Sequence, residues 1–134
     1  MDAIQNEYPS LDMCLSHPTP QGYYHYHSWS PCIKGSGSKE VAPGACADNE
    51  KCSNKEFFDL TLDLAYKDKA NYGGIIGVAK DGHLIVGPYN ENGELWACNE
   101  HDVCNGTFLD DGSYAYVSTT TFPYVVGCFG PAAY

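Results

Sequence analysis

The sequence predicts an all-β domain, a small antiparallel, sandwich-like fold whose long loops are stapled by disulfide bonds. The 134 residues include 11 tyrosines, 14 glycines and 8 prolines. Aromatic residues favour strands, whereas glycine and proline mark the turns between them. Apolar residues recur at every second position from Phe58 to Tyr66, which is typical of a half-buried strand. Asp81-Gly82 lies between two apolar runs and is a strong hairpin signal.

We expect residues 1–21 to form an irregular N-terminal arm and residues 22–134 to form a single domain. Pro9, Pro18 and Pro20 interrupt any regular element in the arm. A chain of this length is ordinarily one domain, and it is large enough to bury a core.

Residues 22–27 are predicted to form an aromatic strand around which the rest is organised. Because side chains alternate between the two faces of a strand, Tyr24 and Tyr26 point one way and His25 and His27 the other. The tyrosine face is expected to pack on the core.

The other predicted elements follow in chain order. They are a polar surface loop at 34–55, a strand at 57–67, a hairpin at 73–89, a loop-rich stretch at 90–113 and a last strand pair at 113–121 and 122–129. Any helix is expected to be short, and residues 98–104 are the place that favours one. The predicted core consists of Tyr24, Tyr26, Leu60, Leu62, Leu64, Ile76, Val78, Ile85, Tyr116, Val125 and Phe129.

Seven cysteines are the strongest compositional signal, and their density is typical of a disulfide-braced protein from an oxidising compartment. They are Cys14, Cys32, Cys46, Cys52, Cys98, Cys104 and Cys128. No Cys-x-x-Cys zinc spacing occurs. The closest spacings predict local disulfide loops between Cys46 and Cys52 and between Cys98 and Cys104. The odd number leaves one thiol free, buried or bonded to another subunit, and the pairing stays open.

Disulfide bonds imply export, although the polar segment after Met1 lacks the apolar core of a signal peptide. We therefore expect an extracellular location or one on a cell or virion surface. Asn105-Gly106-Thr107 is an N-glycosylation acceptor if the chain passes through a eukaryotic secretory route. Glycans on Asn105 are thus one expected modification.

The charge of the chain argues against two classes of partner. Seven lysines, no arginine and 17 acidic residues give a net charge of -10. Nucleic-acid binding needs a basic surface, and base reading relies on arginine. Anionic membrane surfaces also attract basic segments. No apolar run is long enough to cross a membrane. We expect no nucleic acid partner and no membrane insertion.

His25 and His27 are the candidate metal ligands. Two imidazoles on one strand face can reach a single ion, and imidazole suits copper or zinc. His17 is the candidate third ligand, and His83 or His101 are alternatives. A competing interpretation is that the histidines only bond to neighbouring backbone, because two ligands are fewer than a tight site needs.

Four stretches resemble the YHYH-domain family, in the family's order. They are Tyr24-His25-Tyr26-His27, residues 76–89 around Asp81-Gly82, Cys104-Asn105-Gly106 and residues 122–130. The resemblance covers most of the chain from Gly22 onward. It implies an exported or surface β-domain without an established enzymatic activity.

A weak internal repeat accompanies this resemblance. Many family members carry a second Tyr-His-Tyr-His, but here the second copy reads Tyr114-Ala115-Tyr116-Val117. A four-imidazole site therefore cannot form within one chain.

We expect a non-enzymatic structural or assembly module of a matrix, filament, appendage or virion, which associates with itself or with other surface proteins. The alternative is a secreted copper- or zinc-binding protein that uses His25 and His27. An enzyme is disfavoured, because no phosphate loop, nucleophile elbow or His-Glu-x-x-His motif is present. A cysteine beside His101 and Asp102 is better used in a disulfide.

Overall fold

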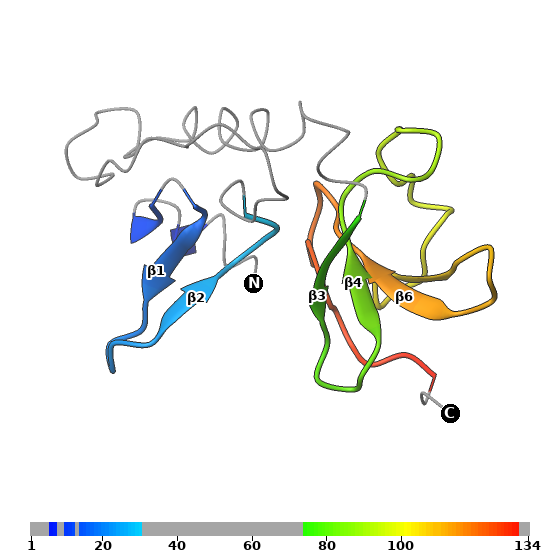
Figure 1. Cartoon of the computed structure of the whole chain (residues 1–134). Coiled ribbons are helices and arrows are strands. Elements are labelled where there is room, and N and C mark those ends of the chain that lie inside the picture. Colours follow the sequence, from blue (N-terminus) through cyan, green and yellow to red (C-terminus); the bar gives the residue numbers. More distant parts are fainter. Residues whose placement is uncertain (1–5, 8–9, 13, 31–73, 132–134) are drawn as a thin grey trace. The chain divides into compact units, whose positions relative to one another are not determined.

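The computed structural model describes residues 6–7, 10–12, 14–30 and 74–131, and the regular elements in these ranges are all strands (Figure 1). The all-β prediction is therefore confirmed. The chain divides into two compact units, Met1–Asp68 and Lys69–Tyr134. The division into an arm at 1–21 and a domain at 22–134 stays a prediction. The predicted loop at 34–55 and strand at 57–67, with its core leucines, lie outside the described residues.

The first unit contains a two-stranded antiparallel hairpin, in which β1 (Ser16–Pro18) pairs with β2 (Tyr24–Tyr26) (Figure 1). In the register of this hairpin, His17 lies opposite His25. The turn closes through a hydrogen bond from the Gly22 N–H to the Thr19 carbonyl, 2.8 Å. Gly22 has a φ of 87°, a conformation that glycine adopts without a steric penalty.

The predicted strand at 22–27 is thus present, but the prediction that its tyrosines belong to the core is wrong. Tyr24 is 51% exposed and Tyr26 is 50% exposed. Their rings contact each other edge to face, with centroids 5.7 Å apart. The Tyr24 hydroxyl also donates to the Asp12 carboxylate, which keeps this face polar. Among the described residues of this unit, the large buried side chains are instead Leu11, Leu15 and Trp29.

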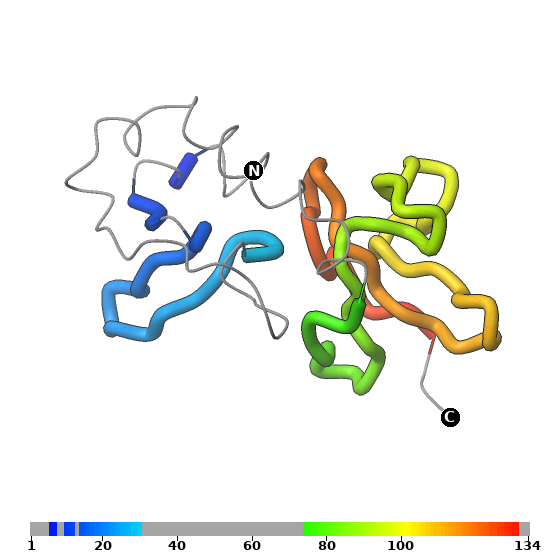
Figure 2. The backbone as a smooth tube through the Cα atoms, turned by 45° about the horizontal axis from the view of Figure 1, so that its top comes forward, coloured from blue at the N-terminus to red at the C-terminus, as the bar shows by residue number. Residues whose placement is uncertain are grey.

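The second unit contains a four-stranded sheet in the order β3-β4-β6-β5. Figure 1 labels β3, β4 and β6, and Figure 2 traces the backbone of the same unit from another direction. Its strands are β3 (Ile75–Val78), β4 (Leu84–Val86), β5 (Gly106–Phe108) and β6 (Tyr114–Val117). The predicted hairpin at 73–89 is confirmed as the antiparallel pair β3–β4, and Gly82 in its turn has a φ of 92°. β4 and β6 are parallel, whereas β5 and β6 are antiparallel.

β6 is the centre of this unit, because it is buried along its whole length. On one face, Ala115 and Val117 pack with Val86, and Leu84 and Trp96 cover that cluster. On the other face, Tyr114 and Tyr116 pack with Cys104, next to Ile85 and Val126. Tyr116 is thus confirmed as a core residue. Val78 and Phe129 are exposed, so their assignment to the core is wrong.

One predicted strand of the second unit is wrong, and the place that favoured a short helix holds none. Residues 122–129 form turns and bends, and β6 pairs with β4 and β5 instead. The reason is local, because Tyr124 has a φ of 66° and its carbonyl accepts a hydrogen bond from the Thr119 N–H, 2.9 Å. Residues 98–104 form turns and no helix. There the Asp102 carboxylate accepts backbone N–H bonds that a helix would need.

The disulfide bonds also differ from the predicted local loops. Cys104 is bonded to Cys128, so the expected Cys98–Cys104 loop is wrong. Cys104 is buried beside β6, whereas Cys98 lies in an exposed turn and is a free thiol. Cys14 is disulfide-bonded as well. The predicted Cys46–Cys52 loop falls outside the described residues.

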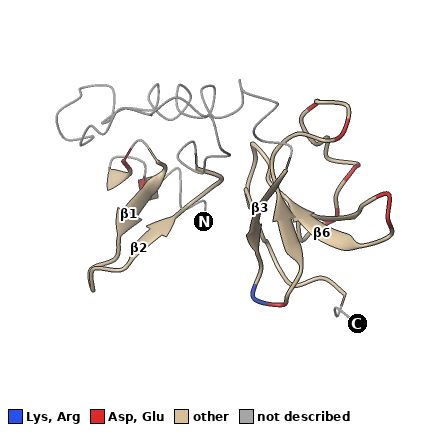
Figure 3. Ribbon diagram, viewed as in Figure 1, with Lys and Arg blue, Asp and Glu red and all other residues tan. Residues whose placement is uncertain are grey.

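Charged side chains in the described ranges lie in loops and turns (Figure 3). Acidic residues occur in several loops of the second unit, whereas the lysine among the described residues is Lys80 in the β3–β4 turn. The described strands therefore contain no Asp, Glu, Lys or Arg. Where the structure is described, no helix has the length and apolar character needed to cross a membrane.

Candidate metal site

Three histidines meet on one face of the β1–β2 hairpin. His17 comes from β1, His25 lies opposite it on β2, and His27 follows two residues later, on the same side as His25. Each offers one ring nitrogen, and these nitrogens lie within 4.8 Å of one another. The ring centroids are 4.7–4.8 Å apart. The fold thus brings together both candidate ligands and the candidate third ligand in a set that could hold a metal ion.

The electrostatics of the site favour the neutral form of His27. Burial lowers the pKa of His27 below its ordinary value of 6.5, because the charged ring is poorly solvated there. The neighbouring His17 and His25 act in the same direction, and Glu7 opposes them. Neutral imidazole is the form that binds metals. Burial, together with the neighbouring His17 and His25, therefore favours the neutral form of His27, which is the form that a metal requires.

The proton positions on His17 follow from its neighbour Ser10. The Ser10 hydroxyl donates its single proton to the Glu7 carbonyl, 2.8 Å away. Its oxygen therefore accepts from Nδ1 of His17, also at 2.8 Å. His17 then carries its proton on Nδ1 and presents a lone pair on Nε2. A metal-binding histidine typically donates its other ring N–H in this way, which fixes the ring orientation.

His25 has the same arrangement in a weaker form. Its Nδ1 faces the Tyr23 carbonyl at 3.4 Å, and a carbonyl oxygen only accepts. The proton therefore belongs on Nδ1, and Nε2 of His25 is left with its lone pair. Nε2 of His27 lies 2.9 Å from Nε2 of His17. With the His17 proton on Nδ1, Nε2 of His27 donates to the lone pair of His17, and a bound ion would take the place of that proton.

Glu7 is the residue of this site that sequence reasoning missed. Its Oε2 lies 3.0 Å from Nε2 of His17 and 3.3 Å from Nε2 of His27. Glu7 stands ten positions before His17, within the stretch predicted to be an irregular arm. No periodic pattern in the sequence points to Glu7. It lies near the histidines because Ser10 bonds both to the Glu7 carbonyl and to His17.

Asp12 holds the hairpin that carries the histidines. Its carboxylate accepts hydrogen bonds from the backbone N–H of Cys14 at 2.8 Å and of Ser16 at 3.3 Å, and from the Tyr24 hydroxyl. Leu15, between the two N–H donors, has a φ of 57°. This left-handed residue turns the chain into β1, and the carboxylate ties the start of β1 to β2.

The second unit repeats this hairpin 90 positions later. The Asp102 carboxylate accepts from the N–H of Cys104 and of Gly106, both at 2.8 Å, and from the Tyr114 hydroxyl at 2.7 Å. The equivalent pairs are Asp12 and Asp102, Cys14 and Cys104, Leu15 and Asn105, Gly22 and Gly112, and Tyr24 and Tyr114. The internal repeat is therefore a repeated structure, and it extends further toward the N-terminus than the motif itself.

The histidine positions are the main difference between the two hairpins. The second copy carries Thr107, Ala115 and Val117 there. Ala115 and Val117 are buried in the sheet core. Of the described residues, those at His17, His25 and His27 make the one group that could hold a metal ion.

The two remaining histidines have structural contacts of their own. His83 is buried, with Nδ1 3.1 Å from the Tyr114 carbonyl and Nε2 2.6 Å from the Pro131 carbonyl. His101 faces the Asp102 carbonyl through Nδ1 at 3.2 Å. Both histidines belong to the second unit, and the three-histidine group does not include them.

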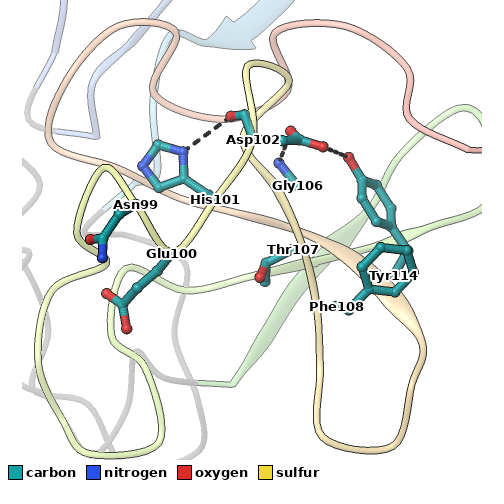
Figure 4. A pocket seen from close by; sticks show the side chains of 8 residues that line it. All are labelled: Asn99, Glu100, His101, Asp102, Gly106, Thr107, Phe108 and Tyr114. Atoms are coloured by element: carbon teal, nitrogen blue, oxygen red, sulfur yellow. Dashed lines mark hydrogen bonds between the residues drawn. The ribbon is translucent and has the colours of Figure 1, made fainter.

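A pocket of about 310 Å³ lies beside β5 in the second unit (Figure 4). Its lining consists of Asn99, Glu100, His101, Asp102, Gly106, Thr107, Phe108 and Tyr114. Glu100 accepts hydrogen bonds from the Asn90 side chain and from the Ala97 N–H. Asp102 accepts the bonds that hold the hairpin. Both carboxylates of the pocket therefore accept hydrogen bonds that stabilise the surrounding loops.

The predicted glycosylation acceptor, Asn105, is buried. It is 2% exposed, and its Nδ2 donates a hydrogen bond to Thr119 Oγ1 at 3.0 Å. A glycan on that nitrogen has no room in the folded unit, so the prediction of a glycan on Asn105 disagrees with the structure. The signal misled because Asn105 occupies the left-handed turn position of the hairpin, with a φ of 64°.

The histidine hairpin lies in the part of the chain that matches a known family. The family described as YHYH protein matches residues 1–95, which is most of the chain. No curated protein and no solved structure matches. A disulfide-bonded β-unit and the family match together indicate an extracellular-type domain. The chain belongs to the YHYH family.

Proposed function

We propose that this chain is a non-enzymatic extracellular domain that binds one divalent transition-metal ion, zinc or copper, through His17, His25 and His27. The observation that carries the proposal is the meeting of three ring nitrogens within 4.8 Å. Imidazole ligands suit zinc and copper, whereas calcium and magnesium take oxygen ligands. No sulfur ligand belongs to the described group, which argues against monovalent copper.

The preparation of the ligands supports this proposal over a purely structural role. Ser10 and the Tyr23 carbonyl place the protons of His17 and His25 on Nδ1, which leaves the lone pair of each ring on Nε2. The Glu7 carboxylate adds negative charge beside the site.

A bound ion would act as a cross-link of the hairpin. It would join β1 to β2 and to the residue that follows β2, in a unit whose hairpin has only two strands. A ligand that binds only the folded state stabilises that state, by an amount that grows with ligand concentration. Stabilisation by the metal is therefore the expected effect on the protein.

The test is isothermal titration of the oxidised protein with Zn²⁺ and with Cu²⁺, followed by metal analysis after dialysis. We expect one ion per chain in the wild type and none in the double variant His25→Ala, His27→Ala. His101→Ala is the matched control, because it removes an imidazole outside the group and should leave binding unchanged. Equal metal content in the wild type and the double variant would refute the proposal.

Self-association is a second candidate function, and it would suit a matrix, filament or virion component. The edge strand β3 exposes Ile75 and Val78, and the opposite edge strand β5 exposes Phe108. Exposed apolar edges are sites for strand addition. Cys98 adds an exposed thiol that could bond to another chain.

Light scattering and non-reducing gels test this second candidate. We expect oligomers that diminish on Val78→Lys and disulfide-linked species that disappear on Cys98→Ser. A strictly monomeric protein at every concentration, with its thiol still free, would exclude it.

A further inference from the structure

We infer that Glu7 is the fourth ligand of the metal, so that the site is a closed three-histidine, one-carboxylate centre with no position open to solvent. This inference rests on the proposed function, and it assigns a coordination number and a ligand that the histidine motif does not contain. The inference rests first on the distances among three ligand atoms of the site.

The three atoms are Nε2 of His17, Nε2 of His27 and Oε2 of Glu7. They are separated by 2.9, 3.0 and 3.3 Å. Tetrahedral zinc with bonds of about 2.0–2.1 Å places its ligand atoms about 3.3–3.4 Å apart. The carboxylate therefore stands at the spacing of a ligand, and small outward movements of the three atoms would admit the ion between them.

Ser10 links this carboxylate residue to the histidines. Its hydroxyl donates to the Glu7 carbonyl and accepts from Nδ1 of His17, each at 2.8 Å. The segment that delivers the carboxylate is thereby tied to the ring it would share an ion with. Ser10 is a positioning residue, because it acts on the metal only through His17 and Glu7.

The chemistry of the ligand set agrees with this assignment. Three neutral imidazoles leave the full charge of a divalent ion uncompensated at side chains that are only 10% and 15% exposed for His27 and His17. One carboxylate halves that charge. Closed four-coordinate sites are structural, whereas catalytic sites keep an open position for water or substrate. A closed site fits a domain proposed to be non-enzymatic.

Cobalt(II) is the probe, because its visible absorption reports coordination number. We expect the Co²⁺-loaded wild type to show a tetrahedral spectrum that azide does not change. We expect Glu7→Ala to bind Co²⁺ about 10- to 100-fold more weakly and to give a spectrum that azide shifts, because a position is now open. Glu7 is 43% exposed, so its replacement should not disturb folding.

Two variants keep the outcomes separable. Glu94→Ala removes an exposed carboxylate from the second unit and should match the wild type. His25→Ala with His27→Ala should abolish Co²⁺ binding altogether. If the wild type binds Co²⁺ but responds to azide as Glu7→Ala does, Glu7 is not a ligand and the proposed function still stands. If the wild type binds no Co²⁺, the proposed function and this inference both fail.

Discussion

The β1–β2 and β5–β6 hairpins of this chain have the same backbone hydrogen bonds, but they differ in the side chains at the histidine positions. Both begin with an aspartate that accepts two backbone N–H bonds and a tyrosine hydroxyl, and both use a left-handed residue at the start of the first strand. In the second hairpin, Ala115 and Val117 belong to the core of a four-stranded sheet. In the first, the equivalent positions are histidines that face one another.

This difference shows that the register of the hairpin is compatible with other residues at the histidine positions. The second copy reaches the same register with small or apolar residues at those positions, because β4 and Trp96 cover that face. The first copy has two strands and gathers ionisable rings there instead. The histidines are therefore the part of the first hairpin that is available for binding.

Exchanging residues at one equivalent position should have the largest effect. Val117→His places a polar ring in a position that is 0% exposed, with apolar neighbours. The lost burial and the unpaired ring nitrogens together should lower the free energy of unfolding by about 3–5 kcal/mol. Urea denaturation of the oxidised protein measures it. The reverse change, His27→Val, should alter the metal-free stability by less than about 1 kcal/mol, and equal losses in the two variants would contradict the comparison.

Removal of the Cys104–Cys128 disulfide should come next. The bond spans 24 positions and encloses the β5–β6 hairpin. Closing a loop of this size restricts the unfolded chain, and replacing both cysteines with serine should cost about 3 kcal/mol by that reasoning. Thermal unfolding with and without the bond measures it. Cys98→Ser is the matched control, since this thiol is free and exposed, and a comparable loss there would argue against the bond as the cause.

Gly106→Ala and Ser16→Ala compare the stability cost of a change at the same position of the two hairpins. A Cβ at Gly106 would lie 1.7 Å from the Tyr114 hydroxyl oxygen, so the ring must move and release Asp102. We expect a loss of about 2 kcal/mol, measured by urea denaturation. Ser16→Ala in the first hairpin should cost about 1 kcal/mol, because the contacts of its hydroxyl with Asp12 and Tyr24 disappear and no ring has to move.

A double variant checks the cause of that loss. If the clash acts through Tyr114, then Gly106→Ala combined with Tyr114→Phe should cost less than the sum of the two single changes. Full additivity would mean that the glycine matters for its backbone alone.

The smallest expected effect is an acid dependence that belongs to the second hairpin. Burial acts to raise the pKa of Asp102, but hydrogen bonds from the Tyr114 hydroxyl and from the Gly106 and Cys104 amides outweigh it and lower the pKa below the ordinary 3.8. Because the folded pKa is the lower one, the carboxylate stabilises the fold above about pH 3.8 and loses this contribution as the pH falls through the folded pKa.

Asp102→Asn should remove that part of the pH dependence. Denaturation midpoints measured between about pH 2 and 6 should fall less steeply with acid in the variant than in the wild type. Glu94→Gln, at an exposed carboxylate, is the control and should keep the wild-type slope. Parallel curves for Asp102→Asn and wild type would contradict the assignment.

Much of the fold could be predicted from local signals. The β3–β4 hairpin follows from Asp81-Gly82 between apolar runs, and the facing of His25 and His27 follows from strand alternation. The role of the tyrosines could not be predicted, because alternation tells which residues share a face and not which face is covered. Tyr116 is buried and Tyr26 is half exposed, although both occupy the same place in the repeat.

The rest of the site depends on contacts that no sequence period encodes. Glu7 reaches the histidines through the fold of the preceding segment, and its pattern with Ser10 is not a recognisable motif. The aspartates were missed for a different reason. A repeat sought around the tyrosines starts too late, and aligning the chain with itself at a shift of 90 would have matched Asp12 with Asp102 and Cys14 with Cys104.

The hydrogen bonds that Asp12 and Asp102 accept suggest different roles for the tyrosines and the histidines of the Tyr-His-Tyr-His motif. In both copies the first tyrosine donates to a carboxylate that precedes it by 12 positions. Tyrosines thus maintain the architecture, and the intervening letters are free to specialise. A search for Asp, eleven arbitrary residues and then Tyr-x-Tyr should therefore find degenerate copies that have exchanged their imidazoles for other side chains.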